Sequence, residues 1–315
     1  MAAGLLALFA PAIFATPAQA CSGCGCNLTS DWLSQGLVSQ PATTVTLRYD
    51  YVPQTQLREN SRVLDRSQIT LPPDREIETS TFNHYATISL DHAFSPVWAV
   101  NVQLPFSYRP HRTIIEDTDA ESLSRTGGVG DLRLTARYQG FGGPGITGIQ
   151  FGLKLPTGRF RQRFINGPAT GEGVDRGLQP GTGTVEAVIG LYHFGKLAGP
   201  VDFVLQGTAE IPLTNRDAYK PGLAGTISTG VQVNAWKGIT PQLQLNLRLA
   251  QRDVGANSDR DNSGGEQLYI APGVSIPVNA HLSAFTIAQL PLHQRVIGYQ
   301  PVARFTMSAG LTYRL

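Results

Sequence analysis

Apolar and polar residues alternate along successive stretches of this chain, a pattern that places them on opposite faces of a β-strand. In the stretch 131–138, apolar residues alternate with Asp131, Arg133, Thr135 and Arg137. A glycine-rich turn follows, and the stretch 149–155 is again apolar at every second position. Tilted strands of about 9 to 11 residues cross a membrane, whereas strands in soluble proteins usually run about 5 to 6 residues. The region 128–158 therefore predicts a hairpin of two membrane-spanning strands.

The same alternation recurs along the rest of the chain and predicts ten further strands. These strands cover residues 43–51, 81–93, 97–109, 184–194, 201–213, 225–236, 242–249, 266–276, 281–290 and 303–315. Tight turns follow the even-numbered strands and mostly long connections follow the odd-numbered ones, as in bacterial outer-membrane barrels. We therefore expect an all-β fold, a transmembrane up-and-down antiparallel β-barrel of about 12 strands. The number becomes 14 if the polar segment 53–77 contains another hairpin.

A soluble barrel or sandwich is the alternative fold. It would hide its apolar stripes in one core, whereas this chain distributes them over every predicted strand. Eight aromatic residues near predicted strand ends are typical of the girdles at membrane interfaces. They are Tyr49, Tyr51, Trp98, Phe106, Tyr138, Tyr192, Trp236 and Tyr313.

Composition narrows the class of protein further. Mean hydropathy is −0.09 and only 15% of the residues are charged. A helical membrane protein needs apolar runs of about 20 residues, but a barrel strand is apolar on one face only. The net charge of +2 gives no basic excess, so nucleic acid is not an expected partner.

The N-terminal region predicts export and a segment ahead of the barrel. Residues 1–20 are apolar and end in Ala18-Gln19-Ala20, which is typical of a cleaved secretory signal peptide, although the expected basic n-region is missing because no Lys or Arg precedes Arg48. Residues 21–42 then form a cysteine-containing periplasmic segment or plug, and 43–315 form the barrel. Four apolar residues at helical spacing in 28–37 would suit a helix that covers the periplasmic mouth, and a disordered tail is the alternative. We expect the mature chain in the outer membrane of a Gram-negative cell.

The three cysteines lie together as Cys21, Cys24 and Cys26 in the sequence CSGCGC. Three thiolates at this spacing could bind Cu(I) or Zn(II), although a tetrahedral site needs a fourth ligand. A disulfide between Cys21 and Cys24, or a lipid on Cys21, are the alternatives. Apart from this metal site, no cofactor is expected.

Charged residues on the polar faces of the strands are expected to line the lumen. There they would form a selectivity filter, or would pair with one another and fill a narrow barrel. The candidates are Arg48, Asp50, Asp91, Arg109, Asp131, Arg133, Arg137, Lys154, Glu210, Arg248 and Arg304, with Glu186, Asp202, Arg252 and Arg314 in the same row.

Several short motifs occur in a fixed order. They are Leu104-Pro105-Phe106, Gly128-Val129-Gly130-Asp131-Leu132, Leu155-Pro156-Thr157-Gly158 and Gln179-Pro180-Gly181-Thr182-Gly183. With this order and spacing, residues 83–315 resemble the outer-membrane barrels assigned to transport in the meta-pathway of phenol degradation. The resemblance implies a channel for small, often aromatic or hydrophobic, solutes. The chain departs from that family in its CSGCGC head and in ending on Leu315, although Tyr313 supplies an aromatic near the end for the barrel-assembly machinery.

The sequence thus favours a porin-like channel whose partners are outer-membrane lipid, a small solute and the assembly machinery. The alternative is a membrane-anchored metal-binding or interaction protein that acts through the cysteine segment. An enzyme is not expected, because the histidines are scattered without a catalytic signature. They are His84, His92, His111, His193, His281 and His293.

Overall fold

The structure is a computed structural model that describes residues 42–69, 76–115, 120–236 and 238–315. The signal peptide and the cysteine segment predicted for residues 1–41 lie outside these ranges. The strands are β1 (Thr43–Asn60), β2 (Arg62–Val63), β3 (Glu76–Ala93), β4 (Trp98–Ile115), β5 (Glu121–Val129), β6 (Leu132–Tyr138), β7 (Ile146–Leu155), β8 (Glu186–Ala198), β9 (Val201–Pro212), β10 (Ala224–Val233), β11 (Thr240–Ala250), β12 (Gly265–Pro277), β13 (Leu282–Ala303) and β14 (Thr306–Arg314). Two 3₁₀ turns, η2 (Arg66–Gln68) and η3 (Arg176–Leu178), are the described helices. Neither is long and apolar enough to span a membrane.

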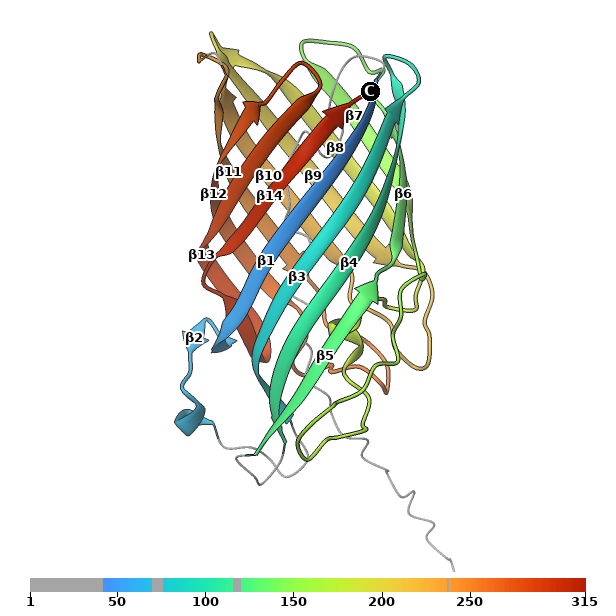
Figure 1. The fold of residues 1–315 in the computed structure, drawn as a ribbon, viewed down its shortest axis with the longest axis vertical. Coiled ribbons are helices and arrows are strands. Elements are labelled where there is room, and N and C mark those ends of the chain that lie inside the picture. The colour runs from blue at the N-terminus through green and yellow to red at the C-terminus, as the bar shows by residue number, and fades with distance from the viewer. Residues whose placement is uncertain (1–41, 70–75, 116–119, 237) are drawn as a thin grey trace, which may run out of the picture.

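The strands form one antiparallel sheet that closes on itself (Figure 1). The first strand pairs with the last, from Thr44 opposite Arg314 to Tyr51 opposite Met307. β5 and β6 are two parts of one strand, because both pair with β4, and β2 pairs only with the end of β1. In the described part of the chain the wall therefore has 12 strands, which confirms the predicted barrel and favours 12 over the 14-stranded alternative. Closure gives the wall's backbone amides and carbonyls the partners that a hydrocarbon environment could not supply.

The two ends of the barrel differ. Long connections join β1 to β3, β7 to β8 and β11 to β12 at one end, which we call the loop end, at the bottom of Figure 1. Short turns and the C-terminus lie at the other end, which we call the turn end. This arrangement matches the alternation of turn and loop lengths predicted from the sequence.

The barrel carries its apolar side chains on the outside. On β11, Leu245 is 42% exposed, whereas the neighbouring Gln244 is fully buried in the interior. The outward set includes Leu47, Ile88, Val100, Leu134, Ile189, Leu205, Ile227, Leu243 and Leu311. The inward set includes Thr46, Ser89, Asn101, Arg137, Gln206, Ser228, Asn246 and Ser308. This inversion of a soluble protein's arrangement suits a barrel whose surface faces hydrocarbon.

Two predicted loops are wrong at their edges. β1 continues through Pro53 to Asn60, and β3 already begins at Glu76. Both ends of the predicted loop 53–77 are therefore strand, and the connection between β1 and β3 is shorter than predicted. In the same way β4 continues to Ile115 and β5 occupies much of the predicted loop 110–127. The strands remain paired where the apolar alternation fades, because a strand that extends beyond the hydrocarbon keeps its ladder but needs no apolar face.

The last hairpin is also longer than predicted. Residues 296–303 pair with β1 in the same direction as β14, whereas residues 282–289 pair antiparallel to β14. The chain therefore reverses within β13, at Gly298, whose φ of 70° is in the left-handed region that glycine adopts without strain. The predicted strand 281–290 is real, but it extends well beyond Leu290.

Most of the predicted aromatic girdle faces outward. Trp98 contacts Tyr138 with ring centroids 4.9 Å apart near the turn end, and Tyr313 is exposed there too. Tyr192 is the exception, since it is only 3% exposed and its hydroxyl donates to Gln139 Oε1. The prediction that Tyr192 belongs to the girdle is therefore wrong, because its strand position points inward.

Replacement of Leu245 by arginine tests the lipid-facing surface. A charge on that surface near the bilayer midplane should lower the free energy of unfolding by about 2 to 4 kcal/mol. The same replacement at Val254, which is exposed in the loop that follows β11, should change it by less than about 1 kcal/mol. Equilibrium denaturant titration in lipid vesicles measures both, and equal losses would show that Leu245 does not face lipid.

Candidate functional site

The interior of the barrel holds two adjoining chambers. The loop-side chamber has a volume of about 190 Å³ and is lined by residues from the barrel wall and from the connections at the loop end. The turn-side chamber has a volume of about 80 Å³ and is lined by the wall alone. Six residues line both chambers, and we call them the waist: Arg48, Gln103, Arg133, Glu210, Ala224 and Arg248.

Strand alternation places the waist residues. Arg48, Arg133 and Arg248 occupy inward positions of β1, β6 and β11 respectively, with an outward apolar residue on either side. Cross-strand pairing sets Arg248 opposite Thr226 of β10, which also lines the turn-side chamber. The waist is therefore a property of the barrel register and not of a flexible loop.

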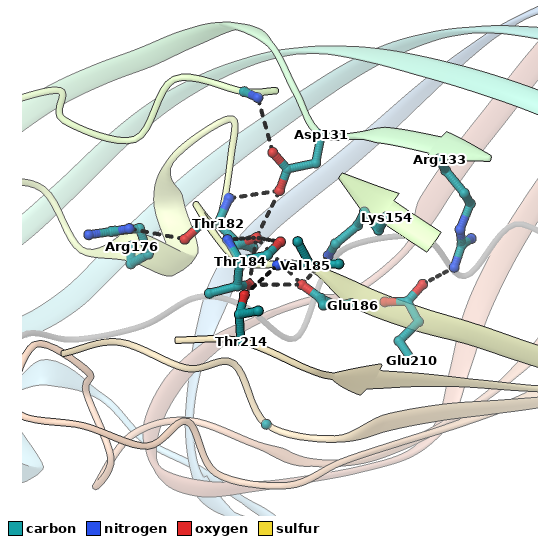
Figure 2. A network of polar contacts seen from close by, with 12 residues as sticks. Asp131, Arg133, Lys154, Arg176, Thr182, Thr184, Val185, Glu186, Glu210 and Thr214 are labelled. Atoms are coloured by element: carbon teal, nitrogen blue, oxygen red, sulfur yellow. Dashed lines mark hydrogen bonds and ion pairs between the residues drawn. The ribbon is translucent and has the colours of Figure 1, made fainter. Parts of the chain in front are cut away.

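Ion pairs connect the inward charges across several strands. Arg133 of β6 donates to Glu210 of β9, and this pair spans β7 and β8. Between them Lys154 of β7 lies 2.7 Å from Glu186 of β8. Figure 2 shows these two pairs side by side. They fix the charged wall of the loop-side chamber, because each side chain is oriented by its partner.

Two further ion pairs lie on other strands of the wall. Arg48 donates its Nε to Asp50 at 2.9 Å, and Ser308 Oγ donates to the other oxygen of the same carboxylate at 2.6 Å. Arg137 holds Asp91 through two bonds of 2.8 and 3.2 Å, a bidentate arrangement. Paired in this way, Asp50 and Asp91 neutralise their arginines and line neither chamber themselves.

The site contains a second cluster at the break between β5 and β6. There Asp131 points inward and accepts three hydrogen bonds, from the amide of Gly158 at 3.0 Å and from the amide and hydroxyl of Thr182 at 2.8 Å each (Figure 2). Thr157 supports the same cluster, because its hydroxyl donates to the carbonyl of Gly130 and accepts from the amide of Leu132. We call these residues the Asp131 knot.

Close backbone contact explains two glycines of the knot. A Cβ on Gly181 would lie 2.5 Å from the carbonyl carbon of Gly158, and one on Gly158 would lie 2.7 Å from the Cα of Gly181. Real Cβ atoms do not approach backbone so closely, so both positions need glycine. All four motifs noted in the sequence meet here, because the amide of Gly130 also donates to the carbonyl of Pro105 at 2.8 Å.

The knot anchors the segment 156–185 over the loop end of the lumen. Beyond the knot, Arg109 Nη1 donates to the carbonyl of Gly177 at 2.6 Å and Thr126 Oγ1 donates to that of Leu178 at 2.6 Å. A small core of Phe164, Ala169, Val174 and Leu178 holds the rest of the segment together. Residues 176–182 consequently form part of the wall of the loop-side chamber.

An arginine in this segment has an aromatic environment. The Arg176 guanidinium lies 4.2 Å from the ring centroid of Phe160 and 5.4 Å from that of Tyr219. It donates to the carbonyl of Thr182 at 3.0 Å and pairs with Asp217 at 3.4 Å. These contacts join segment 156–185 to the connection between β9 and β10, and so stiffen the loop end.

Asp175 makes the stability of this segment depend on pH. Its carboxyl is 1% exposed and accepts from the amide of Gly177, and burial together with the charge of Asp259 raises its pKa well above the usual range. Asp253 and Glu78 raise the same pKa further. A raised folded-state pKa means that, between the unfolded-state and folded-state pKa values of Asp175, the folded segment binds more protons than the unfolded one. The stability of the segment therefore falls as pH rises through this range.

We therefore expect the segment 156–185 to exchange its amide hydrogens more slowly at about pH 5 than at about pH 8, after correction for the intrinsic rate. Asp175→Asn keeps an oxygen acceptor for Gly177 but cannot ionise, so its corrected protection should be the same at both pH values. Hydrogen exchange with mass spectrometry measures this difference. Equal pH dependence in the parent protein and the variant would show that another group is responsible.

The structure places ten of the eleven predicted lumen candidates inside the barrel. Arg48, Arg109, Asp131, Arg133, Arg137, Lys154, Glu210 and Arg248 line a chamber, and Asp50 and Asp91 pair with lining arginines. Arg304, the eleventh, does not face inward as predicted but is exposed in the bend between β13 and β14. Arg252 and Arg314 are exposed as well. These three lie at the ends of strands or between them, where alternation no longer fixes the direction of a side chain.

Sequence reasoning missed the contribution of uncharged residues and of the loop end. Gln103 and Ala224 of the waist, and Thr182 of the knot, carry no charge that would have singled them out. The repeated Gly-Thr and Pro-Gly pairs were the available signal, because glycines inside or beside strands often mark close backbone approach.

The predicted cysteine site cannot be placed, since Cys21, Cys24 and Cys26 lie outside the described residues. Within the described ranges, no group of three or more histidine, cysteine or acidic side chains has an arrangement that could hold a metal ion.

Comparison with solved structures shows the same fold in other proteins. The chain is similar to the COG4313 outer membrane channel from Pseudomonas putida F1, with a TM-score of 0.65 and 14% identity over 88% of this chain and 97% of that one. It is also similar to the translocator domain of the autotransporter NalP from Neisseria meningitidis (TM-score 0.48, 10% identity, 90% and 92% covered). A third is the CymD monoaromatic hydrocarbon channel (TM-score 0.46, 10% identity, 90% of each chain covered). At these identities the first likeness shows a shared fold, and the other two add nothing to it.

No protein-family model matches the chain, and no curated protein matches it. The resemblance to barrels of the phenol meta-pathway therefore stays a prediction.

Proposed function

We propose that this protein is an outer-membrane channel for small solutes of about the size of one aromatic ring. The observation that carries the proposal is the pair of adjoining chambers inside a closed barrel whose outer surface is apolar. An apolar outside suits the hydrocarbon of a membrane, and a polar, charged inside suits a path for solutes. The fold shared with the Pseudomonas putida channel supports the same function and the same membrane.

The size of the path supports small solutes. A cavity of about 150 Å³ can hold benzene, so the loop-side chamber of about 190 Å³ is large enough for one ring and too small for a disaccharide. The turn-side chamber of about 80 Å³ is narrower, and a ring would pass it only if the side chains at the waist moved. The resemblance to barrels of aromatic degradation supports aromatic solutes.

Liposome swelling tests the proposal. Vesicles that contain the purified full chain should take up small charged solutes such as glycine and benzoate faster than protein-free vesicles, and should exclude raffinose. A denaturing gel run with and without heating checks that the barrel is folded in the same sample. Folded protein that admits none of these solutes would rule out a channel.

A further inference from the structure

The waist presents more hydrogen-bond donors than the described residues satisfy. Arg48 uses its Nε on Asp50, and its two terminal nitrogens have no bond among the described residues. Arg133 bonds Glu210 through Nη2, and its Nε is buried without a partner in the described part of the chain. Buried donors normally have an acceptor, so the Nε atoms of Arg133 and Arg248, together with the free terminal nitrogens of Arg48 beside them, point to an acceptor that is not one of the described residues.

Arg248 is the third of these groups and differs from the other two. Its Nε is buried without a partner, and it forms no ion pair with any residue in the described part of the chain. Among the waist residues Glu210 is the single acid, and it already accepts from Arg133. Among the waist residues, Arg248 is therefore the one positive charge without an ion-pair partner in the described part of the chain, since Arg48 is paired with Asp50 and Arg133 with Glu210.

The loop-side chamber that opens onto the waist has flat apolar surfaces. Tyr85, Pro105, Pro180 and Pro221 line it together with charged residues. A ring fits this chamber by volume but not the turn-side chamber, so a ligand that reaches the waist would keep its ring on the loop side. The part of the ligand that enters the waist would meet guanidinium donors and one positive charge without an ion-pair partner in the described part of the chain.

We propose that the waist binds the carboxylate of a small ring acid whose ring occupies the loop-side chamber. Planar guanidinium groups match the geometry of a carboxylate, and hydrogen bonds between charged partners are stronger than neutral ones. A hydrocarbon would leave these donors desolvated and without an acceptor, and a cation would meet the excess positive charge. The proposal rests on the channel function and names the solute class that the same lumen would take.

Equilibrium binding to the full chain in detergent micelles tests the site without requiring transport. Benzoate and benzyl alcohol are the probes, because they share a ring and differ in charge. Calorimetric titration should show benzoate binding at least about tenfold more tightly than the alcohol. Equal affinities, or no benzoate binding at millimolar concentration, would overturn the proposal.

Arg248→Gln and Arg248→Lys identify the residue responsible. The glutamine variant should weaken benzoate binding by about tenfold and leave benzyl alcohol unchanged, and the lysine variant should recover part of the loss. Arg252→Gln is the matched control, because Arg252 is exposed beyond the chambers and pairs with Asp261 at 3.6 Å. An unchanged benzoate affinity in a folded Arg248→Gln variant contradicts the assignment.

The two proposals can fail separately. Solute uptake by liposomes without a preference for benzoate leaves the channel standing and overturns the carboxylate site. Benzoate binding that depends on Arg248, without solute uptake, supports the site and removes the channel.

Discussion

Replacing Asp131 with alanine should raise the single-channel conductance and expose the segment 156–185 to protease. The carboxylate accepts three hydrogen bonds that tie Gly158 and Thr182 to the start of β6. Hydrogen bonds to a charged acceptor contribute about 1.5 to 3 kcal/mol each, so losing all three should weaken the attachment of the segment by about 3 kcal/mol or more. Because residues 176–182 form part of the chamber wall, their release should widen the loop end.

Planar-bilayer recording gives the conductance, and limited proteolysis of the same sample gives the exposure of the segment. Asp65→Ala is the matched control, because Asp65 is exposed in the connection between β1 and β3 and lines neither chamber. The conductance and the cleavage rate of Asp131→Asn should lie between those of the parent protein and of Asp131→Ala, since asparagine keeps an acceptor but loses the charge. Unchanged conductance together with faster cleavage would mean that the segment does not narrow the path.

Replacing Glu210 with glutamine should shift the channel strongly toward anions. This carboxylate faces Arg133 directly and is the acid of the waist, so its neutralisation leaves the positive charges of Arg48, Arg133 and Arg248 there. Two unit charges about 4 Å apart interact by about 4 kcal/mol at an effective dielectric constant of about 20. Even a third of that energy in the path would raise the chloride-to-potassium permeability ratio by about tenfold.

The reversal potential in a potassium chloride gradient reports this ratio. Glu59→Gln serves as the control, because Glu59 pairs with Arg62 at the loop end and lines neither chamber. Recording at low and high salt separates a local effect from a distant one, since distant charges are screened within about 10 Å at 0.1 M salt. Identical reversal potentials for parent and Glu210→Gln protein would place the ion path elsewhere.

The barrel could be predicted from the sequence because a membrane-facing strand obeys a simple rule. Leu243, Leu245, Leu247 and Leu249 alternate with polar residues, and a period of two fixes which side chains face out. The rule no longer applies to the parts of a strand that extend beyond the hydrocarbon of the membrane. Beyond Val52 on β1 the chain is still paired with β3 and then with residues 296–303, yet its sequence no longer alternates cleanly. The prediction is therefore wrong at strand ends and in the long hairpins, whereas the number of strands is right and most side chains face the predicted side, with Tyr192 and Arg304 as exceptions.

The lumen shows the same division. Alternation placed Arg48, Arg133 and Arg248 inside, but it could not show how they pair. Arg48 pairs with Asp50 on the same strand and Arg133 with Glu210 three strands away, whereas Arg248 has no ion-pair partner among the described residues. Which inward side chains meet depends on the stagger of the strands around the barrel and on the length of each side chain, and the alternation pattern specifies neither. The Asp131 knot was visible only as short motifs, since the contact between Gly158 and Gly181 needs the folded loop.

Cysteine labelling of the lumen tests most directly whether solutes pass between the two chambers. In a chain with Cys21, Cys24 and Cys26 replaced by serine, Thr226→Cys places a thiol in the turn-side chamber and Ile227→Cys places one on the exposed apolar surface. A trimethylammonium thiosulfonate reagent should cut the current through the Thr226→Cys channel by more than about half, because the adduct would fill a chamber of about 80 Å³. It should leave the Ile227→Cys channel unchanged. Full labelling of the Thr226→Cys protein by mass, with no loss of current, would contradict a path through this lumen.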